Sequence, residues 1–195
     1  MSVTDITKPV DLSLHAEGTG PKRFQRPVYV DFMPPCNSAC PAGENIQAWM
    51  AYAQAGNYFE AFQTLIEDNP FPAIMGRVCV KPCETGCNRT HIDTTVNIHA
   101  VERYIGDEAI KQKWPIQFVA YSTGKRVLVI GSGPSGLSTA YHLTRMGHTV
   151  EIYEAGGHPG GLLWTGVPDY RLPKEILDAE VDRIVRIGVK IRLNY

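Results

Sequence analysis

The chain has 195 residues, of which 44% are hydrophobic and 20% charged, and its formal net charge is −1. This composition is ordinary for a globular protein, and the balanced charge excludes a broad attraction to nucleic acid or anionic lipid. No apolar run approaches the ~20 residues of a membrane-spanning helix, and the N-terminus lacks a secretory signal. We therefore expect a cytoplasmic protein with no nucleic-acid partner and no membrane span.

The first half of the chain predicts a helical domain behind an irregular start. Residues 1–35 contain Pro, Gly and polar residues without periodicity, which indicates an N-terminal arm. An α-helical domain is expected over residues 36–115, with a linker over 112–124. Apolar residues at helical spacing predict helices over residues 44–55, 58–69 and 97–111, with Pro70 and Pro72 stopping the second. The segment from 77 to 87 is expected to be a cysteine-rich loop.

Cysteine usage is the first unusual feature of this half. The cysteines are Cys36, Cys40, Cys79, Cys83 and Cys87, and none lies in the 108 residues after Cys87. An odd number of cysteines without an export signal argues against a complete disulfide framework. Thiols concentrated in one part of a cytoplasmic chain predict a metal site.

From Lys125 the pattern changes to that of an α/β domain, which we expect over residues 122–195. The run RVLVI is short and continuously apolar, which predicts a strand buried on both faces. Helices are expected over residues 134–146 and 173–187, and the segments TVEIYEA and VKIRL predict two further strands. This β-α-β-loop-α-β order indicates a parallel sheet with helical crossovers, as in Rossmann-like domains.

The turn after the first predicted strand carries a G-x-G-x-x-G motif, which predicts dinucleotide binding. Its residues are Gly131, Ser132, Gly133, Pro134, Ser135 and Gly136. The glycines permit a tight turn, close approach of a pyrophosphate and close helix–strand packing, while the helix N-terminus attracts phosphate. Glu154 ends the second strand 18 residues after Gly136, where a carboxylate accepts hydrogen bonds from ribose hydroxyls. The motif alone does not separate FAD from NAD(P).

Several motifs in a fixed order carry a family resemblance. They are Cys36-Asn-Ser-Ala-Cys40-Pro41, Asn69-Pro70-Phe71-Pro72, Gly76-Arg77-Val78-Cys79, Pro82-Cys83-Glu84-Thr85-Gly86-Cys87, the Gly131–Gly136 loop and the stretch from Gly160 to Pro173. With them, residues 36–195 resemble the N-terminal half of glutamate synthase small subunits and the matching region of dihydropyrimidine dehydrogenase. The resemblance implies an α-helical iron–sulfur domain followed by a partial Rossmann-like FAD-binding domain. It also implies an NAD(P)H domain that this chain does not contain.

The resemblance assigns residues to the FAD site. These are the loop residues from Gly131 to Gly136, with Glu154, Gly161, Leu162 and Arg171. Physically, the Arg171 guanidinium would face a phosphate or the edge of a flavin. The alternative for this side chain is a surface ion pair.

The resemblance also assigns cluster ligands. One [4Fe–4S] cluster would be held by Cys40, Cys79, Cys83 and Glu102, although Glu102 equally fits a solvated helix position. A second cluster would need Cys36, Cys87 and two upstream cysteines, whose positions hold Val28 and Asp31. We therefore expect one cluster, with Cys36 and Cys87 left over or in an irregular metal site. Zinc is the competing metal, but the short spacings here are C-x₃-C, whereas structural zinc sites more often contain C-x₂-C.

The implied function is electron transfer, with no catalytic acid, base or nucleophile in this chain. Electrons would pass between NAD(P)H, flavin and cluster to a partner oxidoreductase subunit or a ferredoxin. The chain ends after the third predicted strand, so the sheet would be completed by the remainder of a longer flavoprotein or by another chain. The alternative is a non-catalytic iron–sulfur docking or adaptor module of a larger oxidoreductase complex.

Overall fold

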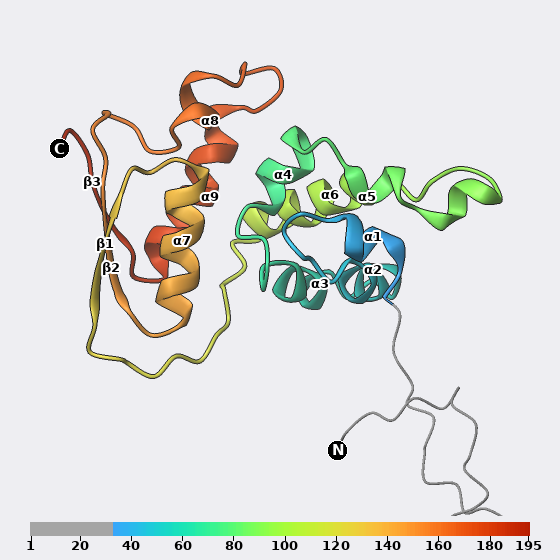
Figure 1. The fold of residues 1–195 in the computed structure, drawn as a ribbon, viewed down its shortest axis with the longest axis horizontal. Helices are drawn as coiled ribbons and strands as arrows, with labels where there is room; N and C mark the ends of the chain where they lie inside the picture. The colour runs from blue at the N-terminus through green and yellow to red at the C-terminus, as the bar shows by residue number, and fades with distance from the viewer. Residues whose placement is uncertain (1–32) are drawn as a thin grey trace, which may run out of the picture. The chain divides into compact units, whose positions relative to one another are not determined.

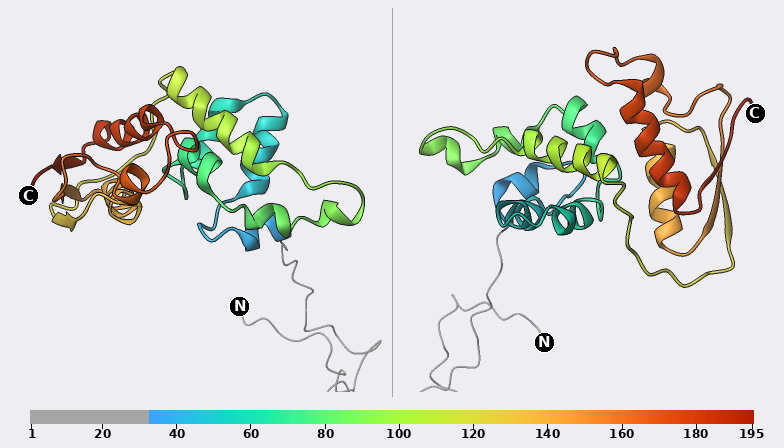
Figure 2. Two further views of the ribbon diagram at one scale, coloured as in Figure 1. Left: turned by 90° about the horizontal axis from the view of Figure 1, so that it is seen from above. Right: turned by 180° about the vertical axis from the view of Figure 1, so that it is seen from behind.

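The computed structural model describes residues 33–195, and Figures 1 and 2 show them from three sides. Positions 28 and 31, on which the second predicted cluster depends, lie outside the described residues, as does most of the predicted arm. From residue 33 the chain first builds a set of helices and then a small sheet with helices beside it.

The helical half contains both short and longer helices. They are α1 (Pro35–Ala39), α2 (Ile46–Gln54), α3 (Tyr58–Leu65), α4 (Pro72–Val78), α5 (Pro82–Thr85), a 3₁₀ helix (Asn88–His91) and α6 (Ile98–Lys111). The three helices expected from apolar spacing are confirmed as α2, α3 and α6. The side chain of Asn45 caps α2 by accepting a hydrogen bond from the Ala48 N–H at 3.2 Å.

The sequence prediction missed the short helices that carry the cysteines. Pro72 was expected only to stop a helix, but it is the first residue of α4, and Pro82 likewise begins α5. Proline suits this first position because its missing N–H has no partner within the helix. The predicted loop over residues 77–87 is therefore wrong in part, because α4 reaches into it and α5 lies inside it.

Two glycines let α4 cross α6 closely. A Cβ added at Gly106 would lie 2.3 Å from the backbone nitrogen of Ala73, and one at Gly76 would lie 2.5 Å from the Cα of Arg103. The guanidinium of Arg77 adds a bidentate pair to Asp107, with N–O distances of 2.7 and 2.9 Å. The helix that leads into Cys79 is thus fixed against α6.

The second half is a three-stranded parallel sheet with helical crossovers, as predicted. Its elements are β1 (Arg126–Ile130), α7 (Pro134–Arg145), β2 (Thr149–Tyr153), α8 (Leu162–Thr165), α9 (Lys174–Arg186) and β3 (Lys190–Arg192). The strand order is β1-β2-β3, with Val127 opposite Val150 and Ile152 opposite Ile191. The helices α7 and α9 lie on the same face of the sheet (Figure 1).

The expectation that RVLVI is buried on both faces is wrong for the described residues. Val127 and Val129 face the helices, but the alternate residues Leu128 and Ile130 are 55% and 86% exposed. The reason is that α7 and α9 cover one face only, and no element between residues 33 and 195 covers the other. The apolar run therefore marks a strand with one covered face and one open face.

Direct contacts join the two halves into one compact unit. The Tyr141 hydroxyl on α7 donates to the carbonyl of Ile66 at 2.6 Å, and Arg145 donates to the carbonyl of Glu67 at 2.6 Å. Phe71 and Ile74 share a core with buried residues of α7, α9 and the sheet. The end of α3 and the whole of α4 are therefore held by the second half. None of the helices from residue 33 onward is long and apolar enough to cross a membrane.

Candidate cofactor and cluster site

The glycine loop after β1 leaves the N-terminus of α7 open to a ligand. Gly131 has φ of +90°, and a Cβ at Gly136 would lie 2.0 Å from the Gly131 carbonyl oxygen, so only glycine fits at Gly136. A Cβ at Gly133 would meet no atom within 4 Å, which leaves open space beside the backbone there. No side chain caps α7, and Pro134 occupies its first position. These features suit a pyrophosphate at the helix N-terminus.

Glu154 lies beside this loop at the end of β2. Its carboxylate accepts hydrogen bonds from the Ser132 N–H at 2.7 Å, the Ser132 hydroxyl at 2.6 Å and the Gly156 N–H at 2.8 Å. These hydrogen bonds, led by the one from the Ser132 side chain, lower the pKa of Glu154, so the side chain is an anion at neutral pH. A fixed carboxylate at this position suits hydrogen bonds to ribose hydroxyls.

The loop after β2 leads to the remaining predicted FAD residues, Gly161, Leu162 and Arg171, and each of them has different surroundings. Gly161 has φ of +54°, and a Cβ there would lie 2.9 Å from the Cα of Gly133, so it packs on the phosphate loop. Leu162 begins α8 and is 75% exposed. Arg171 donates hydrogen bonds to the carbonyls of Arg77 at 3.4 Å and Val78 at 3.2 Å. Its guanidinium thus binds the C-terminal carbonyl groups of α4. This contact differs from both expectations, which were a phosphate or flavin edge and a surface ion pair.

Three predicted cluster cysteines lie at the ends or starts of short helices. Cys40 is the C-terminal cap of α1, Cys79 that of α4, and Cys83 is the second residue of α5. The side chain of Glu84 accepts a hydrogen bond from the His99 N–H at 3.0 Å, which holds α5 against the first turn of α6. The helix α6 carries the fourth candidate, Glu102.

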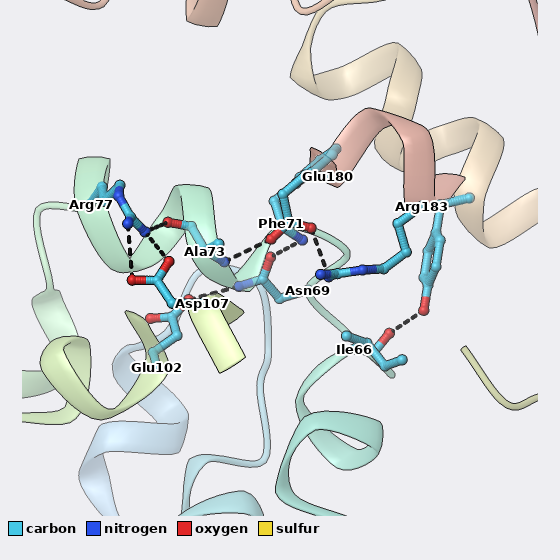
Figure 3. Close-up of polar contacts among 10 residues, drawn as sticks. Ile66, Asn69, Phe71, Ala73, Arg77, Glu102, Asp107, Glu180 and Arg183 are labelled. Carbon is cyan, nitrogen blue, oxygen red and sulfur yellow. Dashed lines mark hydrogen bonds and ion pairs between the residues drawn. The ribbon is translucent and has the colours of Figure 1, made fainter. Parts of the chain in front are cut away.

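Glu102 is not a solvated helix residue. It is 6% exposed and accepts a hydrogen bond from the Asn69 side-chain amide at 2.9 Å. The same amide donates to Glu44 at 3.0 Å, and its oxygen accepts from the Phe71 N–H at 2.9 Å (Figure 3 shows Asn69 between Glu102 and Phe71). Burial, reinforced by the charge of Glu44, raises the pKa of Glu102 to about 9, and burial also raises the pKa of Glu44. Two buried carboxyl groups therefore share one amide beside the cysteines.

Two thiols in this region, those of Cys83 and Cys40, favour their protonated form in the chain alone. Burial, followed by the charges of Cys79 and Cys40, raises the pKa of Cys83 to about 12, and burial raises the pKa of Cys40. A thiolate is the form that binds iron, so loading a metal here would release protons. The positive charge of the metal would replace them.

One cavity of about 690 Å³ joins these groups to the phosphate loop. It is lined by Cys40, Cys79, Cys83, Glu44 and Glu102 on one side, and by Pro134, Ser135 and Ser138 of α7 on the other. Within residues 33–195, no three His, Cys, Asp or Glu side chains gather around a point as for a single metal ion. Three thiols and a carboxyl group around a roomy cavity suit a larger iron–sulfur group, for which thiolates are the ordinary ligands.

Cys36 and Cys87 lie apart from that cavity but close to each other. A Cβ at Gly86 would lie 3.3 Å from the Cβ of Ala39 and 3.7 Å from the Pro35 carbonyl, so α5 packs directly on α1. The pKa of Cys36 is raised by burial and, to a smaller extent, by the charge of Cys87. The two thiols therefore lie outside the cavity lining, where α1 packs on α5.

Sequence reasoning missed part of this site. Glu44 and Asn69 had no assigned role, although Asn69 stands in the quoted Asn69–Pro72 motif. Glu180 on α9 had no assigned role either, but it is 0% exposed and accepts a hydrogen bond from the Ala73 N–H at the start of α4. Of these residues, only Asn69 could have been singled out from the sequence, because it stands in the quoted Asn69–Pro72 motif that precedes the later cysteines.

Comparison with known proteins defines the class. Residues 25–114 match the family described as dihydropyrimidine dehydrogenase domain II, 4Fe–4S cluster. Residues 129–182 match the NAD(P)-binding Rossmann-like domain. The chain is therefore an iron–sulfur domain followed by an NAD(P)-binding Rossmann-like region, as found in oxidoreductases.

Three curated relatives are similar over most of this chain. The NADP(+)-dependent formate dehydrogenase subunit beta of Moorella thermoacetica is 35% identical over 82% of the chain and 26% of its own length. The NAD-dependent dihydropyrimidine dehydrogenase subunit PreT of Escherichia coli K12 is 37% identical over 82% and 39%. Glutamate synthase [NADH] of Schizosaccharomyces pombe is 38% identical over 83% and 8%. These relatives include a dihydropyrimidine dehydrogenase subunit and a glutamate synthase, the proteins that the motifs of this chain resemble.

The chain spans only part of these relatives, between 8% and 39% of their lengths. Among solved structures, histamine dehydrogenase from Rhizobium sp. 4-9 aligns over 40% of this chain and 13% of its own, at 25% identity and a TM-score of 0.32.

Proposed function

We propose that this chain is the N-terminal part of an NAD(P)H-linked FAD and iron–sulfur oxidoreductase subunit that passes electrons to a partner protein. The observation that carries the proposal is the single cavity shared by three cysteines, Glu102 and the first residues of α7. A cluster held by the three cysteines and Glu102 would lie next to a dinucleotide bound at the start of α7. Neighbouring redox groups are what electron transfer requires.

The dinucleotide in this proposal is FAD, bound through its ADP part. The loop from Gly131 to Gly136 binds the pyrophosphate with backbone N–H groups, and Glu154 accepts hydrogen bonds from the ribose. Gly161 keeps the following loop close to Gly133, and Leu162 offers an exposed apolar side chain beside it. NAD(P)H would bind to a domain outside this chain.

The cluster ligands in this proposal are Cys40, Cys79, Cys83 and Glu102. When bound, FAD supplies two-electron chemistry and a [4Fe–4S] cluster one-electron transfer. The protein holds the ligands in place: Asn69 orients Glu102, and apolar residues such as Phe71 and Ile98 line the cavity beside them. Cys36 and Cys87 are not needed for this cluster and would form an irregular site or stay free.

The partner in this proposal is another oxidoreductase subunit or a ferredoxin in the cytoplasm. Support comes from relatives that are themselves named as subunits, such as the beta subunits of formate dehydrogenase and NADPH-Fe(3+) oxidoreductase. The open face of the sheet, with Leu128 and Ile130, would be covered by the remainder of the flavoprotein or a completing chain. A second candidate function is a non-catalytic iron–sulfur docking module, which Val28 and Asp31 favour because they replace two cluster cysteines.

The test is anaerobic purification of the full-length protein, followed by spectra and iron, sulfide and flavin counts. We expect flavin bands and an iron–sulfur shoulder, about four iron atoms per chain, and bleaching of both features by NAD(P)H. Cys79→Ser should remove most of the iron while flavin stays bound. A shoulder without flavin would support the docking module, and colourless protein containing zinc would overturn both functions.

A further inference from the structure

The short helix α4, which leads into Cys79, is held at both ends by residues of the Rossmann-like half. At its N-terminus the Glu180 carboxylate on α9 accepts a hydrogen bond from the Ala73 N–H at 2.9 Å. At its C-terminus the Arg171 guanidinium donates to the carbonyls of Arg77 and Val78 at 3.4 and 3.2 Å. Figure 3 shows the Glu180 end of this arrangement.

The charges at these two ends match the helix dipole. A helix carries partial positive charge at its N-terminus and partial negative charge at its C-terminus. Glu180 is buried and paired with Arg183 at 2.8 Å, so its position is fixed. Arg171 is exposed and stands at the end where Cys79 is the cap. The side chains that complement α4 thus come from 93 or more positions further along the chain.

We propose that Arg171 is a positioning residue for the iron–sulfur site, which it serves by holding the end of α4 and raising the reduction potential of the cluster. The inference rests on the proposed function, since it needs a cluster at Cys79. Two hydrogen bonds to consecutive carbonyls fix the turn from which the Cys79 side chain leaves. The guanidinium also places a permanent positive charge beside a group that gains an electron.

Arg171 and the carbonyl groups at the end of α4 act on the cluster with opposite signs of charge. Carbonyl oxygens at the C-terminus of α4 point negative charge toward Cys79 and oppose the addition of an electron. The guanidinium of Arg171 neutralises part of that charge and favours the reduced state. Replacing Arg171 by an uncharged residue therefore lowers the reduction potential of the cluster. Replacing it by lysine keeps the charge but loses the planar guanidinium, so the potential falls less.

The experiment is a potentiometric titration of the cluster, followed by electron paramagnetic resonance, in the full-length protein with FAD and cluster loaded. Arg171→Gln removes the charge, Arg171→Lys keeps it, and Arg186→Gln removes an exposed arginine at the end of α9 as the control. We expect a potential more negative than the parent's for Arg171→Gln, a smaller negative shift for Arg171→Lys and none for Arg186→Gln. Flavin and iron contents should equal those of the parent.

Each result of the titration either supports or refutes the role of Arg171. If both Arg171 variants titrate at the parent's potential, the inference is wrong. If Arg171→Gln loses flavin while its cluster potential is unchanged, Arg171 is a cofactor ligand and the inference is also wrong. If Arg171→Gln holds no cluster, the Arg171→Lys titration decides by the same criterion. A parent protein without a reducible cluster would instead refute the proposed function.

Discussion

Replacing Glu102 by glutamine tests the buried carboxyl group that faces the cluster cavity. Glutamine has the same shape, and its carbonyl oxygen can still accept the hydrogen bond from Asn69, which is 2.9 Å long in the structure. What changes is titration, because glutamine has no proton to release. The variant therefore removes the cost of ionising this side chain inside the protein.

The magnitude follows from the pKa of Glu102, which rises from 4.5 to about 9 in the folded chain. Between these values the folded state keeps a proton that the unfolded state has lost, so stability falls as pH rises. Each pH unit in that window costs about 1.4 kcal/mol. From pH 5 to pH 7, Glu102→Gln should thus gain about 3 kcal/mol of unfolding free energy relative to the parent.

The assay is urea unfolding of the iron-free protein, prepared anaerobically, at intervals from pH 5 to pH 8. The control is Glu60→Gln, an exposed glutamate on α3, whose stability should follow that of the parent at every pH. Glu44 remains in all three proteins, but it shares the Asn69 amide with Glu102 and its charge raises the pKa of Glu102, so the difference between variant and parent reports the two carboxyl groups together. If Glu102→Gln and the parent lose stability in parallel across this range, Glu102 is not a buried protonated carboxyl and our account of the site fails.

Four further changes test the phosphate loop and the contacts between the halves. Gly136→Ala should prevent flavin binding and destabilise the fold, because its Cβ would lie 2.0 Å from the Gly131 carbonyl oxygen. Gly133→Ala should weaken flavin binding alone, because its Cβ would meet no protein atom within 4 Å. Flavin titration and thermal unfolding distinguish the two variants. Tyr141→Phe should cost about 1 kcal/mol in urea unfolding, because the Ile66 carbonyl loses its 2.6 Å hydrogen bond and keeps only the 3.4 Å one from Arg145; an unchanged midpoint would contradict this. Glu180→Gln should cost about 3–5 kcal/mol, since its buried arginine partner loses a counter-charge; a loss under 1 kcal/mol would refute that reading.

Much of the fold was predictable because it rests on local signals. Apolar spacing indicated α2, α3 and α6, and the RVLVI run with its glycine motif indicated a strand, a phosphate turn and a helix. The short helices α1, α4 and α5 escaped prediction because they are too brief to show periodicity. Each begins at a proline, a residue that can equally end the preceding helix.

The site was predictable where one residue type has one chemical use. Cysteines at short spacing indicated a metal site, and glycines at fixed spacing indicated a phosphate loop. The contacts of Arg171 and Glu180 were not predictable, because they depend on how α9 and the loop before it pack on α4. Nothing in the sequence around Arg171 indicates that its side chain donates to the Val78 carbonyl, 93 positions earlier in the chain.

Asn69 limits how this site can be redesigned. One amide donates to Glu44 and Glu102 while its oxygen accepts from the backbone of Phe71. Aspartate would add a third carboxyl group to a buried space, leucine would supply neither donor nor acceptor, and glutamine would reach one methylene too far. A library that varies the two buried carboxyl groups, at positions 44 and 102, should therefore keep position 69 as asparagine.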